Sequence, residues 1–278
     1  TSLSPASNTT SVTIRPTASF TSSAGANTCS STSVTYTTQS GQSSYVWTLT
    51  GAAGTDYTII AGSTSSTSNT VTIQWLTAGS KTVTVNYTDA NGCSNTSASA
   101  TITVNPLPEN ISGSTLVCTG AGTPLSSATT GGVWSSSAPG VATVGSSSGI
   151  ATGVTTGTAT ISYTVAGCSA TFPVTVNSNP AAIAGASVLC PGASTSLTDA
   201  TSGGAWSSSN TAIATIGAGS GVITGVSGGI VTLSYTLGTG CFSTKTMTIN
   251  PSAPITGTTG VCAGGVTTTL SNTISGGK

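Results

Sequence analysis

The stretch GVWSSS at residues 132–137 returns at residues 204–209 as GAWSSS, and GTATISY at residues 157–163 returns at residues 229–235 as GIVTLSY. Both copies lie 72 residues apart, and the same spacing separates Cys118 from Cys190 and Cys190 from Cys262. A fixed period of this size indicates one folding unit that is copied in tandem. Proteins built in this way usually work through the repeated module rather than through one reactive pocket.

Apolar residues alternate with polar ones through much of the chain. Ala159, Ile161, Tyr163 and Val165 occupy every second position, and the stretch from 172 to 176 repeats the pattern. Alternation of this kind, with many β-branched residues, is typical of half-buried strands. Gly-rich turns separate the short runs, and no segment has the periodicity of an amphipathic helix. The sequence therefore predicts an all-β fold of sandwiched sheets rather than a disordered Ser/Thr-rich stalk.

Short Asn/Pro segments divide the chain: VNPLP at residues 104–108, VNSNP at 176–180 and INPSAP at 249–254. Proline ends a strand and favours extended backbone before it, so these segments are predicted to be short, stiff linkers. The predicted divisions are the last strand of a preceding unit at 1–15, three sandwiches at 16–107, 108–179 and 180–252, and the truncated start of a further unit at 253–278. This arrangement suggests a window on a longer array. The alternative is that the partial units complete a neighbour's sheet by strand donation.

Seven cysteines recur in step with the repeats, as one pair in each repeat with Cys262 left over. The chain has no His and no Cys-x-x-Cys spacing, so the pattern favours disulfides over a zinc site. Spacing alone leaves the connectivity open, but the repetition favours bonds within each repeat. The expected pairs are Cys29 with Cys93, Cys118 with Cys168, and Cys190 with Cys241. Disulfides of this kind predict an oxidising, extracellular environment.

The copied stretches, together with VATV at residues 141–144, resemble the group 2 bacterial Ig-like domain of intimin- and invasin-type adhesins. The first repeat differs, since YVW at 45–47, VTIQW at 71–75 and NGC at 91–93 make it look like a PKD-like domain. The combination is similar to the giant surface adhesins of type IX-secreting gliding bacteria. The resemblance implies a tandem array of Ig-like β-sandwich domains on the bacterial cell surface, which spaces or displays an adhesive tip.

Aromatic residues recur at fixed positions in the repeats, as expected of core residues. The predicted core aromatics are Trp47, Trp134, Trp206, Tyr87, Tyr163 and Tyr235. The four tryptophans of the chain could instead form a platform on which sugar rings stack, and the structure decides between these two interpretations.

Only 3% of the residues are charged, with four basic and four acidic side chains and a net charge of zero. This composition offers no basic surface for nucleic acid, and no apolar run reaches the ~18 residues of a membrane-spanning helix. The carboxylates Asp56, Asp89, Glu109 and Asp199 stand singly, and without His no Ser-His-Asp arrangement exists. We therefore expect no enzyme activity, no cofactor and no metal site in this chain.

The prediction from sequence is an extracellular structural and adhesive repeat region that forms a stalk or filament on the bacterial surface. Its expected partners are further copies in a fibre, because uncharged Thr-rich strand faces lack the repulsion that keeps sheet edges apart. Cell-surface or extracellular glycans are also expected partners, because rows of Thr hydroxyls can hydrogen-bond to sugars. One alternative is a carbohydrate-binding accessory region of a secreted polysaccharide-degrading enzyme. The other is a fibre subunit completed by strand donation.

Overall fold

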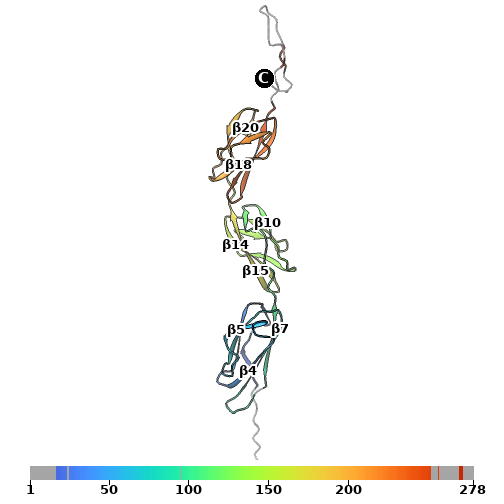
Figure 1. The fold of residues 1–278 in the computed structure, drawn as a ribbon, viewed down its shortest axis with the longest axis vertical. Coiled ribbons are helices and arrows are strands. Elements are labelled where there is room, and N and C mark those ends of the chain that lie inside the picture. Colours follow the sequence, from blue (N-terminus) through green and yellow to red (C-terminus); the bar gives the residue numbers. More distant parts are fainter. Residues whose placement is uncertain (1–16, 24, 95, 252–255, 257–268, 272–278) are drawn as a thin grey trace, which may run out of the picture. The chain divides into compact units, whose positions relative to one another are not determined.

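The structure is a computed structural model that describes residues 17–23, 25–94, 96–251, 256 and 269–271. Every regular element in these residues is a β-strand, as Figure 1 shows. The strand expected at 1–15 and Cys262 lie outside the described residues. So does most of the truncated unit expected at 253–278.

The N-terminal sandwich consists of two sheets, and Figure 1 labels β4, β5 and β7 in it. One sheet has the order β1 (Phe20–Ser22), β3 (Ser33–Thr38), β6 (Thr70–Trp75) and β5 (Tyr57–Gly62). The other has the order β2 (Asn27–Cys29), β8 (Ala98–Asn105), β7 (Gly79–Thr88) and β4 (Ser43–Leu49). Buried side chains from both sheets form one core, with Tyr36 and Ile73 on one side and Trp47 and Val85 on the other. The alternation in the sequence places these apolar side chains on the inner faces.

The C-terminal sandwich also consists of two sheets, but one of them has three strands instead of four. Its larger sheet has the order β16 (Val188–Leu189), β22 (Phe242–Ile249), β21 (Gly229–Leu237) and β18 (Gly204–Ser208). The smaller sheet has the order β17 (Ser194–Ser196), β20 (Val222–Gly225) and β19 (Ala214–Ile216). Its core includes Trp206, Leu233 and Met247 from the larger sheet and Ile223 from the smaller one.

The middle pair of sheets repeats this topology strand for strand, which is what the 72-residue period predicts. The larger sheet has the order β11 (Val133–Ser136), β14 (Gly157–Val165), β15 (Cys168–Asn177) and β9 (Leu116–Cys118). The smaller sheet has the order β10 (Gly122–Pro124), β13 (Ile150–Gly153) and β12 (Ala142–Val144).

The described chain divides into two compact units. The first contains the described residues up to Ser112, together with Ser126–Trp134 and Ser162–Thr171. The second contains Gly113–Leu125, Ser135–Ile161 and the described residues from Phe172 onward. Strands of the middle pair therefore contribute to both units.

A parallel strand pair occurs in each of the three sheet pairs. The cysteine-bearing β2 pairs with the last strand β8, and the register places Cys29 opposite Asn105. In the same way β9 pairs with β15, with Cys118 opposite Asn177. The strand β16 pairs with β22, and the residue after β16 is Cys190. The predicted fold class, an all-β tandem array of Ig-like β-sandwich domains, is confirmed.

Candidate functional site

Two disulfides join cysteines of the described residues, and neither is one of the expected pairs. Cys29 is bonded to Cys168, 139 residues away, within the first compact unit. Cys118 is bonded to Cys241, 123 residues away, within the second compact unit. The expected bonds Cys29–Cys93, Cys118–Cys168 and Cys190–Cys241 are therefore wrong. Among the described residues, Cys93 and Cys190 are left as free thiols.

The strand register explains why bonds within one repeat do not form. Cys29 lies opposite Asn105 at the end of β8, whereas Cys93 lies on the turn that precedes Ala98 at the start of β8. A strand of this length spans about 25 Å at ~3.3 Å per residue. A disulfide needs Cα atoms within about 7 Å, so two cysteines at opposite ends of one strand cannot reach each other. Bonded cysteines here have Cα atoms 5.6 Å apart.

The first junction, around Cys29 and Cys168, is built from backbone groups and one amide side chain. Ser30 N donates to the carbonyl oxygen of Asn105 at 2.8 Å, and Cys168 Sγ lies 3.9 Å from the same oxygen. Asn105 Nδ2 donates to the carbonyl oxygen of Ala166 at 3.0 Å. The asparagine of the Asn/Pro segment therefore holds the turn that carries Cys168 beside the strand that carries Cys29.

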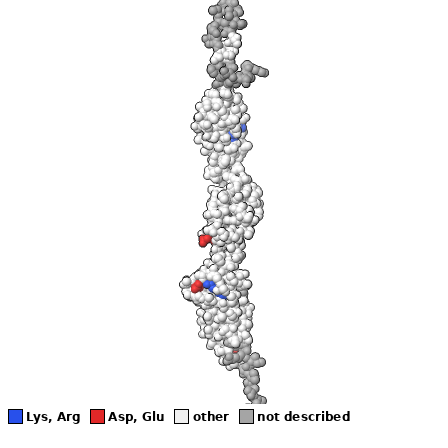
Figure 2. Space-filling model, turned by 90° about the vertical axis from the view of Figure 1, so that its right-hand side faces the viewer, with Lys and Arg blue, Asp and Glu red and all other residues white. Residues whose placement is uncertain are grey.

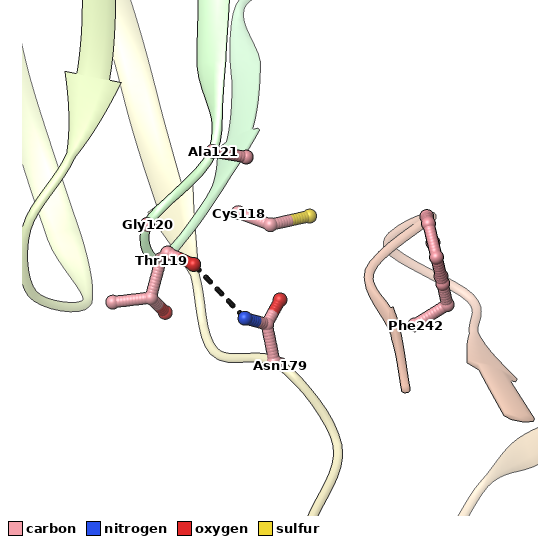
Figure 3. Close-up of a pocket in the computed structure, with 6 residues that line it drawn as sticks. All are labelled: Cys118, Thr119, Gly120, Ala121, Asn179 and Phe242. Atoms are coloured by element: carbon pink, nitrogen blue, oxygen red, sulfur yellow. Dashed lines mark hydrogen bonds between the residues drawn. The ribbon is translucent and has the colours of Figure 1, made fainter. Parts of the chain in front are cut away.

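The second junction, around Cys118 and Cys241, repeats the backbone contacts of the first, but its amide contact comes from a different asparagine and reaches the residue after Cys118. Thr119 N donates to the carbonyl oxygen of Asn177 at 2.9 Å, and Cys241 Sγ lies 3.9 Å from that oxygen. Asn179 Nδ2 donates to the carbonyl oxygen of Thr119 at 2.9 Å, as Figure 3 shows.

An open hollow of about 320 Å³ lies at the second junction, lined by Cys118, Thr119, Gly120, Ala121, Asn179 and Phe242. In Figure 3 the Cys118 sulfur points toward the segment that carries Phe242. The Phe242 side chain is 57% exposed. The lining contains no acid or base, so the hollow offers contact surface rather than catalytic groups.

A tight turn fixes the backbone of Cys118. Ala121 N donates to the carbonyl oxygen of Cys118 at 2.9 Å, and Gly120 N donates to that of Gly153 at 2.8 Å. A Cβ atom at Gly153 would lie 2.7 Å from the Cys118 oxygen and 2.8 Å from a Val176 methyl carbon. Only glycine therefore lets β13 approach the cysteine turn this closely.

The change Gly153→Ala is expected to lower the free energy of unfolding by about 1 to 3 kcal/mol, because the added methyl group overpacks against backbone. Chemical denaturation of the oxidised protein measures the loss. The matched control is Gly140→Ala, since a Cβ at Gly140 meets nothing within 4 Å. Equal stability of the two variants would contradict the close approach.

The predicted core aromatics are buried, with exposed fractions of 7% or less for Trp47, Trp134, Trp206, Tyr87, Tyr163 and Tyr235. Trp134 packs on Tyr163 with ring centroids 4.6 Å apart, and Trp206 packs on Tyr235 at 4.7 Å. Trp75, which the sequence reasoning did not assign to the core, is fully buried against Tyr57. The indole rings thus lie in the hydrophobic cores between the sheets and do not form an exposed platform for sugar rings.

One charged cluster in the N-terminal sandwich was missed by the sequence reasoning. The buried Lys81 donates from Nζ to Thr77 Oγ1 at 2.7 Å and lies 3.5 Å from Asp56 Oδ1. Thr77 Oγ1 donates to Asp56 Oδ1 at 2.7 Å, and this hydrogen bond is the main reason that the pKa of Asp56 is lowered. The signal for the cluster was the inward position of Lys81, two residues before Val83 on the same strand face. The cluster satisfies a buried ammonium group and is a structural feature.

Charged side chains are otherwise sparse. Figure 2 shows a few separate coloured spots on a face that is mostly uncharged. The described residues contain no group of three or more His, Cys, Asp or Glu side chains that could hold a metal ion. Nor does the described part of the chain include a helix that is long and apolar enough to cross a membrane.

No protein-family profile matches the chain, and no curated protein matches it. The chain is similar to the solved structure of a C-terminal 282-residue fragment of intimin in complex with the intimin-binding domain of the translocated intimin receptor. The identity is 20% and the TM-score 0.37, over 58% of this chain and 66% of that one. It is also similar to invasin, a bacterial integrin-binding protein, at 14% identity and a TM-score of 0.33, over 87% of this chain and 60% of that one.

A third similar structure is the S-layer protein rSbsC(31-844), at 15% identity and a TM-score of 0.23, over 87% of this chain and 56% of that one. The chain thus spans less than two thirds of each of these three chains.

Proposed function

We propose that this chain is an extracellular structural and adhesive repeat region that forms a stalk or filament on the bacterial surface. The proposed domains are those predicted from sequence, at 16–107, 108–179 and 180–252. In support, β1 to β8 fall within the first range, β9 to β15 within the second and β16 to β22 within the third. A PKD-like first domain at 16–107 and the resemblance to the surface adhesins of type IX-secreting gliding bacteria belong to this proposal as well.

The observation that carries the proposal is the interlaced pairing of the cysteines. The bond Cys29–Cys168 closes one loop and Cys118–Cys241 closes another, and each loop contains one end of the other bond. Disulfides persist in oxidising compartments outside the cytoplasm, which supports an extracellular location. A chain whose successive domains are joined by disulfides is suited to bear tension.

The consequence for a stretched chain follows from connectivity alone. Without the bonds, about 210 residues between Cys29 and Cys241 could extend to about 700 Å at ~3.4 Å per residue. With both bonds intact, the shortest covalent path runs through Cys168 and Cys118 and contains about 50 residues, or about 170 Å. Complete unfolding under force would therefore lengthen the oxidised chain far less than the reduced chain.

Single-molecule force spectroscopy on the chain held at its two ends tests this function. We expect the oxidised protein to gain about 500 Å less length on full unfolding than the protein treated with a thiol reductant. The variant Cys93→Ser/Cys190→Ser is the matched control and should extend like the unchanged oxidised protein. Equal extension with and without reductant would rule out the tension-bearing role.

The carbohydrate-binding alternative has less support from the site. Its candidate residues were the four tryptophans, and all of them are buried with exposed fractions of 7% or less.

A further inference from the structure

The hollow at the second junction is bordered by an aromatic side chain that the other repeats lack. Phe242 follows Cys241, whereas serine follows the equivalent cysteine in the other two repeats, as Ser169 and Ser94. Phe242 is the first residue of β22, and its side chain is 57% exposed. A single exposed apolar side chain is ordinary on a protein surface, so the surroundings of this ring decide whether it has a role.

The Phe242 ring presents a face to the hollow. Figure 3 shows the ring edge-on, with one face directed across the hollow toward Cys118 and Asn179, and all three residues line the hollow. The disulfide Cys118–Cys241 joins the two sides of the hollow, because Phe242 is the neighbour of Cys241 in the chain. The bond therefore keeps the aromatic ring opposite a polar side chain.

The amide group of Asn179 has a defined orientation. Its Nδ2 donates to the carbonyl oxygen of Thr119 at 2.9 Å, and only the nitrogen of an amide can donate to a carbonyl group. Figure 3 shows the other amide atom, Oδ1, on the side nearer to Phe242. Asn179 is exposed. Its Oδ1 atom is thus placed to accept a hydrogen bond from a hydroxyl group in the hollow.

The first junction lacks both of these side chains, although it has the same backbone contacts. The residue 72 positions before Asn179 is Leu107, and the residue equivalent to Phe242 is Ser169. The bond Cys29–Cys168 forms with this leucine and this serine in place. A junction therefore needs neither the aromatic ring nor the second amide, and their joint presence beside one hollow points to a ligand.

We propose that the hollow at the second junction binds an uncharged sugar ring, which stacks on Phe242 and donates a hydroxyl hydrogen bond to Asn179 Oδ1. The proposal rests on the proposed function and deepens it, because it gives the adhesive role a class of ligand. A pyranose sugar has faces of C–H groups, which suit an aromatic face, and hydroxyl groups at its edge, which suit an amide oxygen. An apolar surface with a few polar groups that fix orientation is typical of ligand sites.

The charge and size of the hollow narrow the ligand class. The lining contains no acid or base, so nothing in it would pair with the charge of an acidic or amino sugar. The volume is about 320 Å³. This value is at the lower end of the range for ligand sites, about 300 to 1,000 Å³, and therefore suits one sugar ring rather than a larger ligand.

The test titrates the oxidised full-length chain with the methyl glycosides of glucose, galactose and mannose and follows the NMR signals of the phenylalanine rings. At least one of these sugars, with about 13 non-hydrogen atoms, is expected to bind with a dissociation constant on the order of 1 to 10 mM. The Phe242 signals should shift until the site is saturated, while those of Phe20 and Phe172 stay unchanged. Added salt should leave the dissociation constant unchanged, because the ligand has no charge.

Two variants give the second junction the side chains of the first. Phe242→Ser is expected to weaken binding by about 10-fold, because the stacking surface is lost. Asn179→Leu should weaken it by about 5-fold, as expected for the loss of one neutral hydrogen bond. Phe242→Tyr keeps an aromatic face and should retain binding. The matched control is Ile230→Ser on the neighbouring strand β21, since Ile230 is 67% exposed and does not line the hollow; it should bind like the unchanged protein.

Three results would overturn the proposal. The first is the absence of any Phe242 shift with all three sugars at concentrations about tenfold above the expected dissociation constant. The second is a Phe242→Ser protein that binds as tightly as the unchanged protein, which would place the sugar elsewhere. The third is a dissociation constant that rises with salt, which would mean a contact through charge. The force experiment involves no sugar, so the tension-bearing function and the sugar site can fail separately.

Discussion

The substitution Trp206→Ala is expected to lower the free energy of unfolding of the C-terminal sandwich by about 3 to 5 kcal/mol, the range for loss of a large buried aromatic side chain. Trp206 is 7% exposed and belongs to the core cluster of that sandwich. Its cross-strand partner in the register is Tyr235, and the two rings lie with centroids 4.7 Å apart. Removal of the indole leaves a cavity and also removes this ring contact.

Chemical denaturation measures the loss, and hydrogen exchange of the amides in β21 and β22 assigns it to the C-terminal sandwich. The matched control is Ile230→Ala in the same sheet, because the Ile230 side chain is 67% exposed. An exposed substitution of this kind is expected to stay within about 0.5 kcal/mol of the unchanged protein. A Trp206→Ala protein with unchanged stability would refute the core assignment and would reopen the sugar-stacking interpretation.

The strand content could be predicted because alternation and β-branched composition act locally. Residues such as Ile161 and Leu233 occupy inward positions of their strands, and both are fully buried. The recurring tryptophans could be placed in the interior for the same reason, since a position copied in each repeat keeps its place relative to the strand pattern. Period and alternation together therefore sufficed for the fold class.

The disulfide connectivity could not be predicted, because repetition shows which positions are equivalent but not which copies of them meet. Cys29 and Cys93 belong to one repeat, yet the parallel pairing of β2 with β8 puts them at opposite ends of a strand. The parallel pairing was the missing information, and a short strand such as β2 gives no clear signal for it in the sequence. The Asp56–Lys81 contact was missed for a similar reason, because Asp56 lies in a turn whose position depends on tertiary structure.

The double substitution Cys118→Ala/Cys241→Ala is expected to lower the free energy of unfolding by up to about 5 kcal/mol. A bond that closes a loop of this length removes about that much chain entropy from the unfolded state, and strain or residual structure reduces the gain. The bond joins residues 123 positions apart. Alanine suits the test because Cys241 is 0% exposed, and a serine there would add the cost of a buried hydroxyl group.

Denaturant titrations under oxidising conditions measure this loss. Under reducing conditions the unchanged protein also lacks the bond, so the variant and the unchanged protein should then have similar stability. The control variant is Cys93→Ala/Cys190→Ala, which breaks no bond among the described residues and is expected to change stability by less than about 0.5 kcal/mol. The two variants separate the two connectivities, because bonds within each repeat would pair Cys93 with Cys29 and Cys190 with Cys241. If the control variant lost several kcal/mol, the bonds would lie within the repeats, and no disulfide would connect successive domains.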